Sequence, residues 1–112
     1  MKKIEAILRP EKLDDVLDKL EELGYSGLTV GAVEGHGRQK GIVEMFRGKE
    51  YNLKLIPKVK IEIVAKNGSV EKIVNAIVET AYTGNVGDGK LFILPVDDAV
   101  RVRTKERGEG VI

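Results

Sequence analysis

The sequence predicts an α+β fold, because two segments alternate with the period of a strand and two others repeat with the period of a helix. Apolar and polar residues alternate over residues 2–9 and again over 58–65. Apolar residues recur every three or four positions over 13–23 and over 70–81, as on one helix face. With 112 residues, 42% of them hydrophobic, we expect a single domain, residues 1–112, with its own core.

The first part of the chain predicts a strand, a helix and a second strand. The first strand covers Lys2 to Arg9, and Pro10 and Glu11 suit the first turn of the helix that follows. Gly24 is expected to end this helix as its C-cap, and residues 28–33 form the second strand. The apolar face of the helix consists of Leu13, Val16, Leu17, Leu20 and Leu23.

The second part of the chain repeats this order. A strand over 58–65 is followed by a turn in which Ser69 is the expected N-cap of the second helix. A strand over 91–95 follows, then a short fifth strand or extended tail over 100–104 and a polar tail over 105–112 without regular structure. The apolar face of the second helix consists of Val70, Ile73, Val74, Ile77, Val78 and Ala81.

This order of elements, with short connections and right-handed crossovers, predicts the ferredoxin-like split βαβ sandwich, βαββαβ. Both helices would cover one face of the sheet. The opposite face keeps apolar residues such as Ile7 and Val64, so we expect a homo-oligomer.

Composition narrows the function classes. The chain has no cysteine, which excludes disulfides, thiolate metal sites and a cysteine nucleophile. A net charge of +1 and only five aromatic residues argue against nucleic acid as a partner. The charged N-terminus does not resemble a signal peptide, and no apolar run approaches the roughly 20 residues of a membrane span. We expect a cytoplasmic protein.

The most informative stretch is the glycine loop, residues 83–90. Gly84, Gly89 and Lys90 fit half of a P-loop, but Leu91 stands where a P-loop has the Ser or Thr that binds Mg²⁺. Gly84, Gly87 and Gly89 can adopt positive φ, so the loop amides can form an anion nest beside the Lys90 charge. The alternative is a plain helix-to-strand connection with a surface lysine.

Two further basic segments suit phosphate. Arg101 and Arg103 would lie on one face of a strand and form an oxyanion clamp, with Lys90 on a neighbouring strand; the alternative is two solvated charges. Residues 35–41 interleave glycines with basic and amide groups, and Gln39 could offer a carbonyl oxygen to a hard cation. His36 is the only histidine, so no metal cage of protein side chains is expected.

The long segment from about residue 36 to 56 has no clean period, and such loops are uncommon unless they are functional or disordered. Its middle, Phe46 to Tyr51, includes Arg47, and these residue types suit partner recognition. The alternative is a β-hairpin extension without a role.

Together these segments resemble the PII nitrogen-regulatory signal-transduction family over nearly the whole chain. Residues 83–92 look like the B-loop of that family, Arg101 to Thr104 like its C-loop, and residues 35–41 with 46–51 like its flexible T-loop. Residues 58–62 look like its third strand.

The resemblance implies a homotrimer with an ATP or ADP site in each cleft between subunits. Residues implied to bind the nucleotide are Gly87, Asp88, Gly89 and Lys90 at the phosphates and ribose, Thr29 and Val64 at the adenine, Gly35, Gly37 and Arg38 at the phosphate end, and Arg101 and Arg103 from the neighbouring subunit. Gln39 would bind Mg²⁺ together with ATP and 2-oxoglutarate. Residues implied to bind 2-oxoglutarate are Gln39, Lys40, Gly41 and Lys58.

The T-loop is implied to reach a target, such as an ammonium transporter whose channel Arg47 would plug, or an enzyme of nitrogen metabolism. The protein would then be recruited reversibly to the inner face of the membrane. Tyr51 matches the tyrosine that is uridylylated in some bacterial relatives. Two alternatives to a sensor without enzymatic activity are a slow nucleotide phosphohydrolase, with Asp88 or Glu62 as its base, and an RNA-binding ferredoxin-like module.

Overall fold

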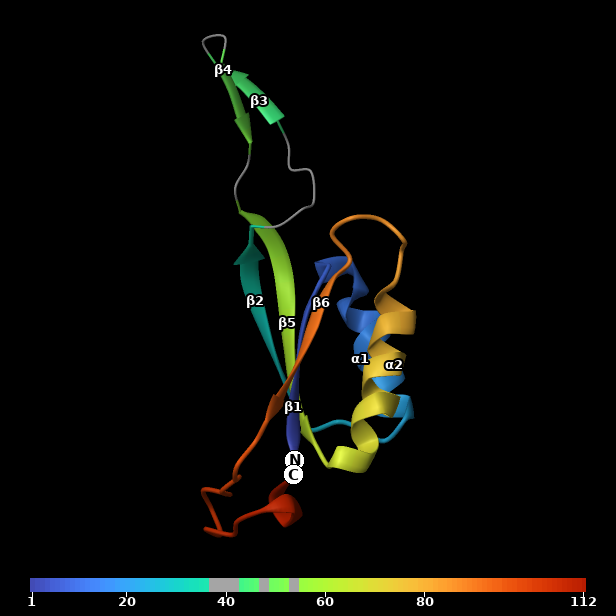
Figure 1. Ribbon diagram of the computed structural model, residues 1–112, viewed down its shortest axis with the longest axis vertical. Coiled ribbons are helices and arrows are strands. Elements are labelled where there is room, and N and C mark those ends of the chain that lie inside the picture. The colour runs from blue at the N-terminus through green and yellow to red at the C-terminus, as the bar shows by residue number, and fades with distance from the viewer. Residues whose placement is uncertain (37–42, 47–48, 53–54) are drawn as a thin grey trace.

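The protein forms one four-stranded antiparallel sheet with two helices on one face (Figure 1). The computed structural model describes residues 1–36, 43–46, 49–52 and 55–112. The sheet strands are β1 (Lys2–Leu8), β2 (Leu28–Gly35), β5 (Ile56–Ala65) and β6 (Gly89–Pro95), in the spatial order β2-β5-β1-β6. This order, with β1 and β5 in the centre, confirms the predicted ferredoxin-like fold.

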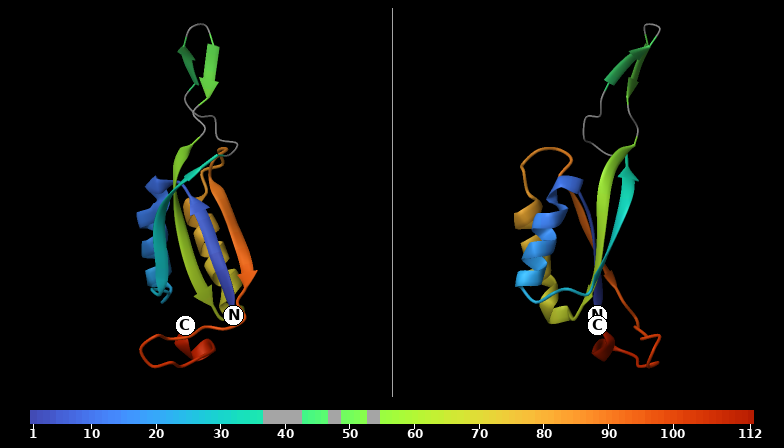
Figure 2. Two further views of the ribbon diagram at one scale, coloured as in Figure 1. Left: turned by 90° about the vertical axis from the view of Figure 1, so that its left-hand side faces the viewer. Right: turned by 180° about the vertical axis from the view of Figure 1, so that it is seen from behind.

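The helices α1 (Leu13–Glu22) and α2 (Val70–Ala81) pack side by side, and each follows a short 3₁₀ turn, Pro10–Lys12 or Asn67–Ser69. Both views of Figure 2 show the two helices on the same side of the sheet. Alternate side chains of a strand point to the same face of the sheet, so every second residue of β1 and β5 packs against the apolar faces of the two helices. The buried core consists of Ile4, Ala6, Leu8, Val16, Leu20, Val59, Ile61, Ile63, Ala65, Val70, Ile73, Ala76, Ile77 and Ala81.

Gly24 ends α1 as the sequence predicts. Its φ is +90°, the Gly24 amide donates to the Glu21 carbonyl at 2.9 Å, and the Tyr25 amide donates to the Leu20 carbonyl at 2.8 Å. This pair of bonds is a Schellman motif, which needs a residue that tolerates positive φ. Ser69 occupies the N-cap position of α2, as the sequence predicts, but it also ends the 3₁₀ turn, and its side chain makes no hydrogen bond to the start of α2.

The uncovered face of the sheet is polar in its centre and apolar toward β6. Lys3 pairs with Glu62 at 3.5 Å, and Lys60 pairs with both Glu5 and Glu62 at 3.3 Å. On β6, Phe92 pairs across from Glu5 and Leu94 from Lys3, so both lie on this face. Their exposed fractions are 50% and 38%.

The long segment contains the β-hairpin that the sequence left open as one alternative, whereas the C-terminal part differs from the prediction. The long segment includes a second ribbon, β3 (Val43–Phe46) paired with β4 (Lys49–Asn52), which extends past the sheet (Figure 1). The fifth strand over 100–104 does not form: Val100 makes a single bridge to Arg107, and residues 102–104 form a turn. The tail then folds back into a 3₁₀ turn, Glu109–Val111, instead of lacking regular structure.

Candidate functional site

The glycine loop connects α2 to β6 at one end of the sheet. Gly84, Gly87 and Gly89 have φ values of +89°, +104° and +110°, as their spacing predicts. At Gly89 the loop passes so close to β1 that a Cβ atom would lie 1.9 Å from the Ile7 carbonyl oxygen. Glycine is therefore required here both by the backbone conformation and by the lack of space.

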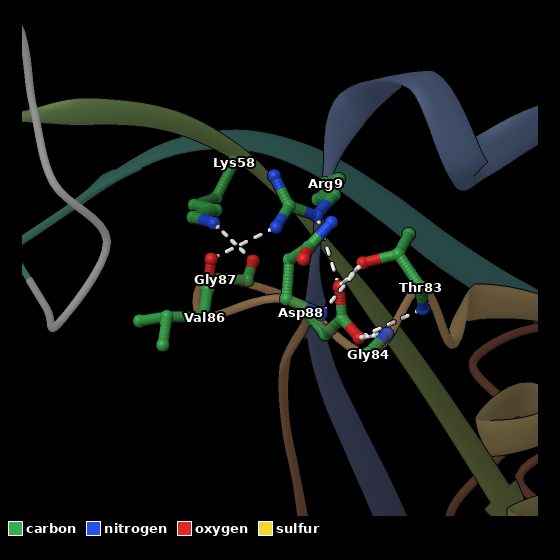
Figure 3. Close-up of polar contacts among 8 residues, drawn as sticks. Arg9, Lys58, Thr83, Gly84, Val86, Gly87 and Asp88 are labelled. Atoms are coloured by element: carbon green, nitrogen blue, oxygen red, sulfur yellow. Dashed lines mark hydrogen bonds and ion pairs between the residues drawn. The ribbon is translucent and has the colours of Figure 1, made fainter.

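Asp88 holds the loop in shape from within. Its carboxylate accepts hydrogen bonds from the Thr83 hydroxyl, from the Thr83 amide at 2.8 Å and from the Gly84 amide at 2.9 Å. It also accepts a bond from Nε of Arg9 at 3.1 Å (Figure 3). These donors favour the charged carboxylate, so the pKa of Asp88 lies well below its ordinary value, mainly because of Thr83.

Two cations bind the loop carbonyls from outside. An Arg9 guanidinium nitrogen donates to the Val86 carbonyl at 2.9 Å, and the Lys58 ammonium donates to the Gly87 carbonyl at 2.7 Å (Figure 3). Burial lowers the pKa of Lys58, and the neighbouring Arg9 charge lowers it further. The partly buried ammonium is thus held at the edge of the loop, where its charge is only partly screened from an anionic group.

Beside the loop lies a cleft of about 700 Å³, within the range of small-molecule sites. Lys90 is exposed, and within the described part of the chain its ammonium has no hydrogen bond or ion-pair partner. Asp88, whose charge is offset by Arg9, is the acidic residue of the described lining. The cleft is lined by Ile7, Gly35, His36, Ile56, Lys58, Asn85, Val86, Gly87, Asp88, Gly89, Lys90 and Phe92.

The structure thus brings together one group of the residues predicted from the sequence. Gly35, from the end of β2, and Lys58, from β5, lie in the same cleft as residues 87–90. Thr29 and Val64 lie toward the other end of the sheet. Val64 is six residues from Lys58 along β5, a separation of about 20 Å.

Arg101 and Arg103 also lie at that far end, which corrects the prediction of a clamp beside Lys90. Strand β6 carries the chain away from Lys90 before the tail begins (Figure 1). Arg101 pairs with Glu106 at 3.3 Å and with the Gly110 carbonyl at 3.4 Å. Because residues 102–104 form a turn and no strand, the alternation that would place both guanidiniums on one face is absent.

Several predicted site residues cannot be placed. Gly37, Arg38, Gln39, Lys40, Gly41 and Arg47 lie outside the described residues. Tyr51 belongs to β4, opposite Glu44. Among His, Asp and Glu side chains in the described ranges, no group of three is arranged to hold a metal ion.

Arg9 is the residue that the sequence analysis missed. It contacts Asp88 from 79 positions away in the chain. The local sequence, in which Arg9 follows a strand and precedes Pro10, indicates only the end of a strand, and no local motif links Arg9 to the glycine loop. Only the closing of β6 against β1 brings the two together.

Both candidate bases of the phosphohydrolase alternative are occupied. Asp88 is bound by Arg9 and by the loop amides, and Glu62 is paired with Lys3 and Lys60 on the sheet face. The depressed pKa of each carboxylate makes it a weak proton acceptor. In the described part of the chain, no helix has the length and apolar character needed to cross a membrane.

Comparison with known proteins identifies similar chains. The family model described as Nitrogen regulatory protein P-II matches residues 1–106. The chain is 51% identical over 112 residues to Nitrogen regulatory protein P-II of Azospirillum brasilense and 50% identical to that of Haemophilus influenzae, covering all of each. It is also 51% identical to Nitrogen regulatory protein P-II 2 of Methanothermobacter thermautotrophicus, covering 97% of that protein.

These matches extend over the sheet, both helices and the glycine loop alike, and confirm the resemblance first suggested by the loop motifs. The chain belongs to the nitrogen regulatory protein P-II family.

Proposed function

We propose that this protein is a nitrogen-regulatory signal transducer that senses ATP and ADP in the cleft beside the glycine loop. The observation that carries the proposal is the meeting of the positive-φ loop with Lys58 and Lys90 in one cleft of about 700 Å³. The relatives are named as regulatory proteins and not as enzymes, which fits a sensor.

The charges of the cleft favour a phosphate chain. Lys90 offers an ammonium group at the mouth of the loop, and the Lys58 ammonium lies next to Gly87. The Asp88 carboxylate would otherwise oppose an anion, but Arg9 and the amides of Thr83 and Gly84 offset its charge. The balance of charge in the cleft is therefore positive, as phosphate requires.

The proposed assembly is a homotrimer in which neighbouring subunits share each nucleotide. Val64, assigned to the adenine, lies about 20 Å from Lys58 along β5, too far for one phosphate and one base on the same chain. Thr29, the other residue assigned to the adenine, pairs across from Glu62, about 13 Å from Lys58 along the sheet. The tail, which contains Arg101 and Arg103, begins at the far end of the sheet, where the Val96 amide donates to the Met1 carbonyl at 3.1 Å (Figure 1). A second copy that brings its far end to this cleft would complete the site.

We further propose that 2-oxoglutarate binds only together with Mg-ATP. Gln39 would hold Mg²⁺ jointly with the nucleotide and 2-oxoglutarate, and Lys40, Gly41 and Lys58 would bind the carboxylates. The position of the Lys58 ammonium, 2.7 Å from the Gly87 carbonyl, supports this, because a carboxylate can replace that carbonyl as its partner.

The T-loop would carry the signal to a target. Strands β3 and β4 extend past the end of the sheet where the cleft lies (Figure 1), so a ligand in the cleft lies near the base of this ribbon. An ammonium transporter is the proposed target, with Arg47 at the contact, peripheral recruitment to the membrane and enzymes of nitrogen metabolism as further partners. Tyr51, on β4, is the proposed modification site.

Calorimetric titration with ATP tests the proposal. We expect binding by the unchanged chain, and Lys90→Ala should weaken it roughly tenfold or more, since a charge-assisted contact to phosphate is lost. Lys72→Ala, which removes an equal charge from the exposed surface of α2, is the control and should bind as the unchanged chain does. No binding at millimolar ATP would contradict the proposal.

In a second titration, 2-oxoglutarate is added to the protein with and without Mg-ATP. Heat of 2-oxoglutarate binding should appear only when Mg-ATP is present. Sedimentation with membranes that contain an ammonium transporter then tests the target. The protein should be released or retained according to whether 2-oxoglutarate is added with ATP. If the amount of protein that sediments with the membranes does not depend on either ligand, the transporter is not the target. That result would not contradict the proposed nucleotide site.

A further inference from the structure

The glycine loop is held in place from the end of β1 by a single side chain. The Arg9 guanidinium donates to the Asp88 carboxylate at 3.1 Å and to the Val86 carbonyl at 2.9 Å. Arg9 is largely buried, with 14% of its side chain exposed. It therefore bridges two points of the loop in a fixed geometry, which suits the planar fork of arginine.

Arg9 is not among the described residues that line the cleft, whereas Asp88 is. Arg9 lies next to Lys58, and it contacts the cleft lining through Asp88 and Val86, to which it donates (Figure 3). Both carboxylate oxygens of Asp88 accept hydrogen bonds. One accepts from Arg9 and the Thr83 hydroxyl, and the other accepts from the amides of Thr83 and Gly84.

A carboxylate in an anion cleft is a liability unless it is paired. Without Arg9, the Asp88 charge would remain beside Lys90 and repel a phosphate in a partly desolvated site. The same loss would free the Val86 carbonyl and loosen the turn that orients the loop amides. Both effects act on the ligand through Asp88 and the loop.

We propose that Arg9 is a positioning residue for anion binding, which fixes the glycine loop through Val86 and Asp88 and neutralises the Asp88 carboxylate in the cleft. The inference rests on the proposed function in one respect, namely that the anion is the phosphate chain of a nucleotide.

The test is a set of four ATP titrations, with the unchanged chain, Arg9→Met, Asp88→Asn and the double variant. Arg9→Met should weaken ATP binding by about tenfold or more. Adding Asp88→Asn to Arg9→Met should restore at least roughly threefold of that loss, because the uncompensated charge is gone. Lys19→Met, an equal charge change on the outer side of α1, is the control and should leave ATP binding unchanged.

Whether ATP affinity rises when Asp88→Asn is added to Arg9→Met distinguishes a positioning role of Arg9 from other roles. If Arg9 touched the phosphates directly, or if it served stability alone, the double variant would bind ATP no better than Arg9→Met, and the inference would be overturned. Arg9→Lys keeps the charge but cannot bridge both partners, so its affinity should fall between the unchanged chain and Arg9→Met. Arg9→Met with unchanged affinity would also overturn the inference.

A second measurement needs no nucleotide. In the free protein, the amides of Thr83 and Gly84 are bound to Asp88, so their hydrogen exchange reports the loop geometry. Arg9→Met should speed this exchange at least about threefold, and Lys19→Met should not. Equal exchange rates would overturn the inference, whereas failure of the unchanged chain to bind ATP would count against the proposed function alone.

Discussion

At Gly89 the backbone leaves no room for a side chain. A Cβ atom there would lie 1.9 Å from the Ile7 carbonyl oxygen, and this oxygen belongs to the backbone of a central strand. The φ of +110° is also one that residues with a side chain rarely adopt. Strand β1 and the glycine loop are therefore joined at a point that tolerates only glycine.

Gly89→Ala should lower the free energy of unfolding by about 2 kcal/mol or more, through backbone strain and displacement of β1. Gly68→Ala is the matched control, because no atom lies within 4 Å of its Cβ position and its φ is not positive. It should change the free energy of unfolding by less than about 0.5 kcal/mol. Urea denaturation measures both, and equal losses would contradict the steric argument.

The positive φ values of the loop glycines could be predicted from sequence, since spacing and residue type determine them locally. The role of Arg9 could not, because its partner Asp88 is 79 positions away and meets it only after β6 pairs with β1. The local pattern at residues 9–10 describes a strand end and contains no sign of a long-range ion pair.

Among the elements, α2 shows how far periodicity reaches. Its bounds, Val70–Ala81, agree with the apolar repeat in the sequence. Of two adjacent residues placed on the apolar face, Ile77 is fully buried but Val78 is 47% exposed. Periodicity predicts which side of the helix faces the core. Burial of each residue also depends on which residues of the sheet lie opposite, and the apolar face of α2 is wider than the part that packs against the sheet.

Ile77→Ala should therefore lower the free energy of unfolding by about 3 kcal/mol, since it leaves a cavity between α2 and the sheet. Val78→Ala at the next position should cost less than about 1 kcal/mol, because that side chain is half in solvent and alanine favours the helix. Thermal and urea unfolding of the two variants check this. A cost at Val78 as large as at Ile77 would mean that another surface covers α2, such as a neighbouring copy in the proposed homotrimer.

The tail shows the opposite limit. Val100 and Val102 alternate with Arg101 and Arg103 as in a strand, yet Val102 is 93% exposed and lies in a turn. A strand needs a partner as well as a pattern, and the described sheet ends at β6. A four-residue alternation without a partner is too short to determine its own conformation.

At the scale of the whole molecule, the residues assigned to the nucleotide fall into two groups at opposite ends of the sheet. Lys58, Lys90 and the glycine loop lie at one end, and Arg101 and Arg103 at the other. The resemblance to the family implies these residues but not how far apart one chain holds them, because that separation depends on the direction of β5 and β6. The proposed shared site between copies is motivated by this separation, and it can be tested by mixing two variants.

Lys90→Ala removes a group from the loop end and leaves the tail intact, while Arg101→Ala with Arg103→Ala does the reverse. Each chain alone should bind ATP weakly. In mixed rings assembled from equal amounts of both, about a quarter of the sites should combine an intact loop with an intact tail and regain the affinity of the unchanged chain. Each chain refolded with itself is the control. If the mixture binds no more tightly than its two components, each chain would be using its own groups, and the shared site would have to be abandoned even if ATP still binds in the cleft.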